Sequence, residues 1–130
     1  MKCLIVEDDF TSRLLLQRIL SAYGNCDVAV TGKEALLAFD LALDKREPYD
    51  LILLDIMMPE MNGREVLEYI REKEKSQEVN PRNEVKVIVT TSLDSPKDVF
   101  GIFMEGCTSY LVKPLVRKKI VEEIQSLGLL

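Results

Sequence analysis

One short stretch constrains the fold most: the aliphatic run Leu51 to Leu54, followed by Asp55 and a turn that reaches Pro59. An unbroken apolar run of this length, ended by a turn, is typical of a strand buried on both faces of a parallel sheet. Such a strand carries Asp55 at its carboxyl end, which in open α/β sheets borders the crevice where ligands bind. We therefore expect Asp55 to lie in a functional site, although a lone carboxylate at a strand end is more often only a surface group.

The rest of the chain repeats the order strand then helix. Besides 51–54, apolar runs predict strands at 2–6, 26–30, 85–89 and 109–112. Helical spacing of apolar residues predicts a helix after each strand, and Thr31, Asn62 and Ser95 stand where helix caps are expected. This alternation predicts an α/β protein with a doubly wound parallel sheet of five strands and helices on both faces. The charged segment 71–84 is expected to be a helix end followed by a solvated loop.

Length and composition limit the classes of function. A chain of 130 residues is expected to form one domain, and its net charge of −5 with dispersed basic residues argues against direct binding of nucleic acid. No apolar run approaches membrane-spanning length, so we expect no membrane insertion and a cytoplasmic location. Histidine is absent, and Cys3, Cys26 and Cys107 lack the spacing of a zinc site or a redox dithiol, so buried free thiols are expected.

Polar residues follow the predicted strands at their carboxyl ends. Glu7 and Asp8 follow the first strand, Asp55 the third, Thr91 the fourth and Lys113 the fifth. Carboxylates crowded at one edge raise one another's pKa unless a cation offsets their charge. With oxygen ligands and no histidine, the expected ion is Mg²⁺, or Mn²⁺, with room left for water and phosphate oxygens. The pattern predicts a phosphoryl-transfer site.

With these residues in this order, the chain resembles a CheY-like receiver domain of the two-component response regulators. The resemblance covers essentially all of residues 1–130. The resemblance implies the flavodoxin-like sheet order 2-1-3-4-5. It also implies a single receiver domain with no output domain in these residues. The chain would then be a regulated phosphoacceptor in a phosphorelay rather than an enzyme, promoting only its own phosphorylation and slow dephosphorylation.

The resemblance assigns roles to the acidic residues. Asp55 corresponds to the aspartate that is phosphorylated, and it also corresponds to a metal ligand. Glu7 and Asp8 correspond to the acid pair that holds Mg²⁺, and the backbone carbonyl of Met57 corresponds to a further ligand. Asp9 is not expected to be a ligand. The implied phosphoryl donor is a sensor histidine kinase or a histidine phosphotransfer protein.

The resemblance also assigns the switch. Thr91 and Lys113 correspond to the hydroxyl and the ammonium group that assist catalysis at Asp55, and Lys113 is commonly joined to the next proline by a cis peptide bond. Thr91 and Tyr110 correspond to the switch pair that changes position after phosphorylation. The helix after Ser95 has more apolar residues than one sheet face can cover, so part of it is expected to reach solvent. The partner face is expected to comprise Val99, Phe100, Phe103, Tyr110, Lys118 and Lys119.

Two other functions remain open at this point. An aspartate-nucleophile phosphatase that depends on Mg²⁺ would also place an aspartate at a strand end, but it needs a second aspartate two residues later, where this chain has Met57. An interaction scaffold that is never phosphorylated would keep the fold without the chemistry. The intact acid pair, Thr91 and Lys113 argue against the scaffold.

Overall fold

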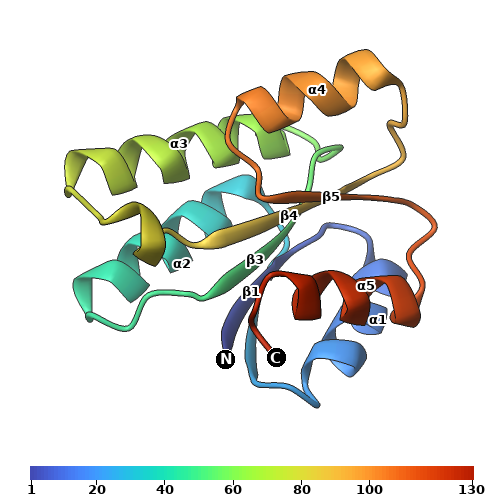
Figure 1. The fold of residues 1–130 in the computed structure, drawn as a ribbon, viewed down its shortest axis with the longest axis horizontal. Coiled ribbons are helices and arrows are strands. Elements are labelled where there is room, and N and C mark those ends of the chain that lie inside the picture. The colour runs from blue at the N-terminus through green and yellow to red at the C-terminus, as the bar shows by residue number, and fades with distance from the viewer.

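A parallel sheet of five strands forms the centre of the protein in the computed structural model, which describes residues 1–130 (Figure 1). The strands are β1 (Lys2–Val6), β2 (Asn25–Ala29), β3 (Leu51–Asp55), β4 (Lys86–Thr91) and β5 (Ser109–Val112). Their order across the sheet is β2-β1-β3-β4-β5. The structure thus confirms the predicted α/β class, the strand number and the order 2-1-3-4-5.

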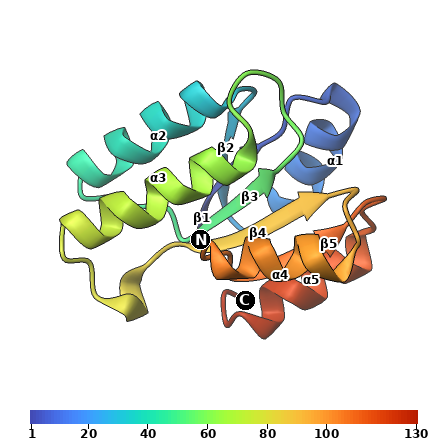
Figure 2. The same ribbon diagram turned by 90° about the horizontal axis from the view of Figure 1, so that it is seen from above.

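Five α-helices cover the two faces of the sheet (Figures 1 and 2). They are α1 (Phe10–Leu20), α2 (Gly32–Asp44), α3 (Gly63–Ser76), α4 (Pro96–Met104) and α5 (Arg117–Ser126), and a short 3₁₀ helix, η1 (Pro81–Asn83), precedes β4. Thr31, Asn62 and Ser95 each accept a hydrogen bond from a backbone N–H of the following helix, as predicted for caps. No helix is long and apolar enough to cross a membrane.

Alternation of side chains along the strands divides the apolar core in two. Leu4 and Ile52 point to the face that α2, α3 and α4 cover, and they belong to an apolar cluster that includes Phe39. Cys3 and Leu53 point to the opposite face, where α1 and α5 pack. Because both faces of the central strands are buried, β1 is apolar from Cys3 to Val6 and β3 from Leu51 to Leu54, which explains the unbroken runs in the sequence.

Three details differ from the expectations. β4 begins one residue later and extends two residues further than the predicted 85–89, so Thr91 is part of the strand. The segment 71–84 is the end of α3 followed by a loop, as expected, but its helical part is not fully solvated, because Glu74 is buried and accepts hydrogen bonds from Arg71 and from the backbone of Val85. All three cysteines are free, as expected, but Cys26 is only half-buried.

Candidate functional site

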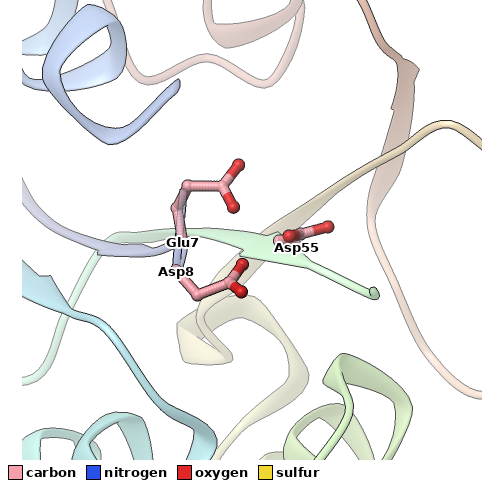
Figure 3. Close-up of side chains that lie close together, drawn as sticks. All are labelled: Glu7, Asp8 and Asp55. Atoms are coloured by element: carbon pink, nitrogen blue, oxygen red, sulfur yellow. The ribbon is translucent and has the colours of Figure 1, made fainter. Parts of the chain in front are cut away.

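The ends of β1 and β3 bring three carboxylates together. The two strands pair in parallel with Val6 opposite Leu54, so the next residues, Glu7 and Asp55, are neighbours. One carboxylate oxygen from each of Glu7, Asp8 and Asp55 lies within 4.8 Å of the others, and the three groups face a common space (Figure 3). Glu7 and Asp55 are 0% and 2% exposed, whereas Asp8 is exposed. The site therefore has a buried floor and an open side.

Lys113 supplies the positive charge of this site. It follows β5, and its Nζ reaches across the sheet edge to lie 2.7 Å from Glu7 Oε1 and 3.6 Å from Asp55 Oδ2. Burial lowers the pKa of Lys113, but the neighbouring carboxylates of Glu7 and Asp55 outweigh burial and raise it above its ordinary value. Lys113 is thus held as a cation. The peptide bond between Lys113 and Pro114 is cis, as expected.

Asp55 is hard to ionise in the absence of a second cation. Burial, followed by hydrogen bonding and repulsion from Glu7, raises the pKa of Asp55 to about 7, although Lys113 and the backbone N–H of Met57 act in the opposite direction. That N–H donates to Asp55 Oδ1 at 3.1 Å. A cation bound between Glu7 and Asp55 would remove the repulsion and favour the carboxylate form.

Mg²⁺ fits these residues. The available donors are carboxylate oxygens, which Mg²⁺ prefers, and one such oxygen from each of the three residues lies within 4.8 Å of the others. Asp9 is not in this group, because its carboxylate accepts the N–H of Ser12 at 2.9 Å and caps α1. The same hydrogen bond lowers the pKa of Asp9. The expectation that Asp9 is not a ligand agrees with this contact.

The sequence analysis did not identify two residues that shape the site. Arg13 in α1 donates from Nη1 to the backbone carbonyls of Glu7 and Asp8, at 3.1 and 3.3 Å, and so fixes the turn that carries both acids. Gly63 opens α3 directly against the end of β3, where an added Cβ would lie 2.3 Å from the carbonyl oxygen of Asp55. Nothing in the pattern around Arg13 reveals its contact. The sequence shows that a glycine follows the Asn62 helix cap. It does not show that the backbone at Gly63 packs closely against the end of β3.

Thr91 and Tyr110 are connected through the backbone of one loop residue. The Oγ1 of Thr91, which is fully buried, accepts the N–H of Leu93 at 3.2 Å. The Tyr110 hydroxyl donates to the carbonyl oxygen of Leu93. Thr91 and Tyr110 therefore share Leu93 as a hydrogen-bonding partner, which the sequence analysis did not identify as a connection.

The expected partner face is exposed in the structure. In α4 only Ile102 is fully buried, whereas Phe100 and Phe103 are 66% and 44% exposed, which confirms that part of the helix reaches solvent. The rings of Phe103 and Tyr110 lie 6.4 Å apart. Val99 is half-buried, Lys118 is exposed on α5, and Lys119 lines a pocket of about 230 Å³ together with Tyr110. The face thus spans α4, β5 and α5, with β5 between the two helices in Figure 1.

Comparison with known proteins identifies the family of the chain. Residues 3–125 match the response regulator receiver domain family. A chemotaxis protein CheY homologue of Campylobacter jejuni is 29% identical, over 96% of this chain and 90% of that protein. A hybrid signal transduction histidine kinase of Dictyostelium discoideum is 34% identical over 98% of this chain, which spans only 7% of the kinase.

Solved structures show the same family likeness. CheY in the CheX–CheY–BeF₃–Mg²⁺ complex of Borrelia burgdorferi has a TM-score of 0.85 and 27% identity, covering 98% of this chain and 89% of that chain. The receiver domain of a histidine kinase of Arabidopsis thaliana, solved with Mg²⁺ and BeF₃⁻, has a TM-score of 0.80 and 29% identity, covering 96% and 89%. The chain therefore belongs to the response regulator receiver domain family, the phosphoacceptor switches of phosphorelay signalling.

Proposed function

We propose that Asp55 is the residue of this switch that accepts the phosphoryl group, from the phosphohistidine of a sensor histidine kinase or a histidine phosphotransfer protein. The observation that carries the proposal is the position of Asp55: it is 2% exposed, 3.6 Å from Lys113 and grouped with Glu7 and Asp8. With no histidine of its own, the chain cannot supply the donor group. A small acyl phosphate is a chemically equivalent donor.

The transfer exchanges one bond to phosphorus for another. An oxygen of the Asp55 carboxylate attacks phosphorus, the bond from phosphorus to the donor nitrogen breaks, and that nitrogen keeps the electron pair. Little covalent chemistry is required of the protein, so its task is to position groups and offset charge. Lys113 Nζ, close to Asp55 Oδ2, takes up negative charge on the phosphoryl oxygens, and the Thr91 hydroxyl donates to one of them.

The metal site belongs to the same proposal. Asp8, Asp55 and the backbone carbonyl of Met57 would hold Mg²⁺, with Glu7 as a direct ligand or through water. When bound, the ion neutralises charge on the phosphoryl group and on the carboxylates. Mn²⁺ suits the same oxygen donors.

We further propose that the chain is not an enzyme that turns over free substrates. An aspartate-nucleophile phosphatase needs a second acid two residues after its nucleophile, and here Met57 exposes an apolar side chain at that position. The α4-β5-α5 face, with Phe100, Phe103 and Tyr110, is the surface that a downstream protein binds. We place this activity in the cytoplasm, as a single receiver domain that does not itself bind nucleic acid.

Labelling with phosphate tests the assignment of Asp55. The parent incubated with Mg²⁺ and radiolabelled acetyl phosphate should take up label that hydroxylamine releases, as expected for an acyl phosphate, and Asp55→Asn should not. Asp9→Asn is the matched control, because asparagine retains the helix cap and should leave labelling intact. Equal labelling of Asp55→Asn and the parent would show that another residue is the acceptor. Multiple turnover of an added phosphate ester would instead favour the phosphatase.

A further inference from the structure

Two cysteines that are distant in the sequence lie side by side in the sheet. Cys3 in β1 and Cys26 in β2 are direct partners in the strand register, and their Sγ atoms are 2.9 Å apart. Neighbouring strands are about 4.8 Å apart, which is within the range of Cα separations of about 4.4–6.8 Å that disulfides span. Both side chains lie on the face covered by α1 and α5. Strand pairing thus supplies a juxtaposition that the spacing of the two cysteines along the chain does not reveal.

The two sulfurs differ in access. Cys3 is 0% exposed, whereas Cys26 is half-buried and belongs to the edge strand β2. Burial, together with the hydrogen bond to Cys26, raises the pKa of Cys3. A small oxidant therefore meets Cys26 first, with Cys3 already in contact behind it. Cys107 belongs to the apolar cluster on the other side of the sheet and cannot compete as a partner.

We propose that Cys3 and Cys26 are a modification site: a thiol pair that a peroxide oxidises to a reversible disulfide between β1 and β2. The Cys26 sulfur attacks one oxygen of hydrogen peroxide, the O–O bond breaks, and the other oxygen leaves as water with the thiol proton. Cys3 then attacks the sulfur of the resulting sulfenic acid, whose hydroxyl leaves as a second water with the proton of Cys3. Peroxide is reduced, and the two thiols are oxidised.

The bond would require little movement of the chain. The two sulfur atoms are 2.9 Å apart and must approach to a bond length of about 2.05 Å. Rotation of the two side chains can supply this change. The resulting loop, residues 3–26, contains α1 and the turn that carries Glu7 and Asp8. The disulfide would therefore tie the edge strand to the strand that leads into the acidic site. This inference is independent of phosphorylation at Asp55.

Mass spectrometry tests the proposal directly on the parent protein. Dilute protein is treated with hydrogen peroxide, unfolded in the presence of an alkylating reagent, and digested with trypsin. We expect a loss of about 2 Da from the chain, two of the three thiols protected from alkylation, and a cross-link between the peptides 3–13 and 19–33 that dithiothreitol reverses. The same treatment in urea should form this cross-link much more slowly, because the strand pairing is lost.

Single substitutions test whether the cross-link joins Cys3 to Cys26 or involves Cys107. Cys107→Ser should form the cross-link like the parent, and Cys26→Ser, altered at a half-buried position, should keep both remaining thiols. The proposal is overturned if the parent keeps three thiols after treatment, if Cys26 stops at sulfenic or sulfinic acid, or if the cross-link involves Cys107 or a second chain.

Discussion

Lys113 Nζ and Glu7 Oε1 are 2.7 Å apart, although the two residues are 106 positions apart in the sequence. Glu7 is fully buried, and a buried carboxylate is strongly disfavoured unless a cation compensates it. This ion pair therefore allows the floor of the site to be acidic before any metal binds. It also leaves Lys113 beside Asp55, where charge would develop on the phosphoryl group in the proposed transfer.

Removal of the exposed acid of the site should weaken metal binding. Asp8→Ala deletes one anionic oxygen donor, so we expect the affinity for Mg²⁺ to fall about tenfold or more, as judged from the strength of a charge contact near a protein surface. Calorimetric titration measures this directly. Asp9→Asn, which keeps the cap of α1, should change the affinity far less. An unchanged affinity in Asp8→Ala would exclude Asp8 as a ligand.

The raised pKa of Asp55 has a consequence for stability. In the metal-free folded state Asp55 keeps its proton up to a pKa of about 7, whereas in the unfolded chain it loses the proton near 3.8. Between these values the folded state binds the additional proton, so the contribution of Asp55 to the free energy of unfolding falls as the pH rises. Asparagine does not titrate. The stability of Asp55→Asn relative to the parent should therefore increase between about pH 4 and pH 7.

Urea unfolding in the presence of a chelator, at several pH values, measures this difference. Saturating Mg²⁺ should reduce the advantage of Asp55→Asn at high pH, because the metal stabilises the carboxylate of the parent and not the amide. A stability difference that does not change with pH would contradict the raised pKa.

A second buried carboxylate has a structural role away from the site. Glu74 accepts the backbone N–H of Val85 and the Nη1 of Arg71, each at 2.7 Å, and Arg71 also donates to the carbonyl of Gly106. These contacts join the end of α3 to the start of β4 and to the turn after α4. Glu74→Ala removes the nearest carboxylate from a partly buried guanidinium and leaves the buried N–H of Val85 without an acceptor, so we expect a loss of about 3 kcal/mol in the free energy of unfolding. Glu72→Ala, at an exposed position on α3, should change it by less than about 0.5 kcal/mol.

The sequence allows the sheet to be predicted well because periodicity is a local signal. Runs such as Leu51 to Leu54 identify buried strands, and the carboxyl ends of parallel strands share one edge, so Glu7, Asp55 and Lys113 could be grouped without coordinates. The grouping is confirmed by distance. The role of each side chain in phosphorylation remains a proposal.

Contacts that depend on tertiary packing could not be predicted in this way. Arg13 binds backbone carbonyls, and because every residue has one, no sequence pattern identifies this contact. Glu74 is buried, but in the sequence it resembles its exposed neighbours on α3. The contact of Cys3 with Cys26 depends on the register of β1 and β2, which no local pattern specifies. Each missed feature therefore lies in the pairing of elements rather than in their formation.

Residues beside Asp55 should influence how long the phosphoryl group persists. Met57, 58% exposed, and Leu93 are both apolar, so neither can orient a water molecule for attack on the acyl phosphate. We expect slow loss of label from the parent and faster loss from Met57→Asn and Leu93→Glu, followed after removal of acetyl phosphate. Met57→Leu serves as the apolar control. Variants that lose label no faster than the parent would contradict this role.

The connection from Thr91 through Leu93 to Tyr110 should carry the signal to the partner face. The Thr91 Oγ1 has a backbone donor in the structure, the N–H of Leu93. When Thr91 turns to donate to a phosphoryl oxygen, that contact changes, and the Leu93 carbonyl that accepts the Tyr110 hydroxyl changes with it. A phosphoryl group shifts such an equilibrium only through contacts that differ between the two states, and the hydroxyl of Thr91 supplies one. Tyr110, with its ring near Phe103, then alters the α4-β5-α5 face.

Beryllofluoride with Mg²⁺, as a mimic of the phosphorylated state, makes this route measurable by NMR. Resonances of α4 and Tyr110 should shift well beyond those of α2, and Thr91→Ala should abolish the shifts at the partner face while those around Asp55 persist. Thr91→Ser keeps the hydroxyl and should restore the distal response, which separates the loss of the hydrogen bond from a general disturbance of β4. If the distal shifts survive in Thr91→Ala, or if the parent shows shifts only around Asp55, the signal does not travel through Thr91.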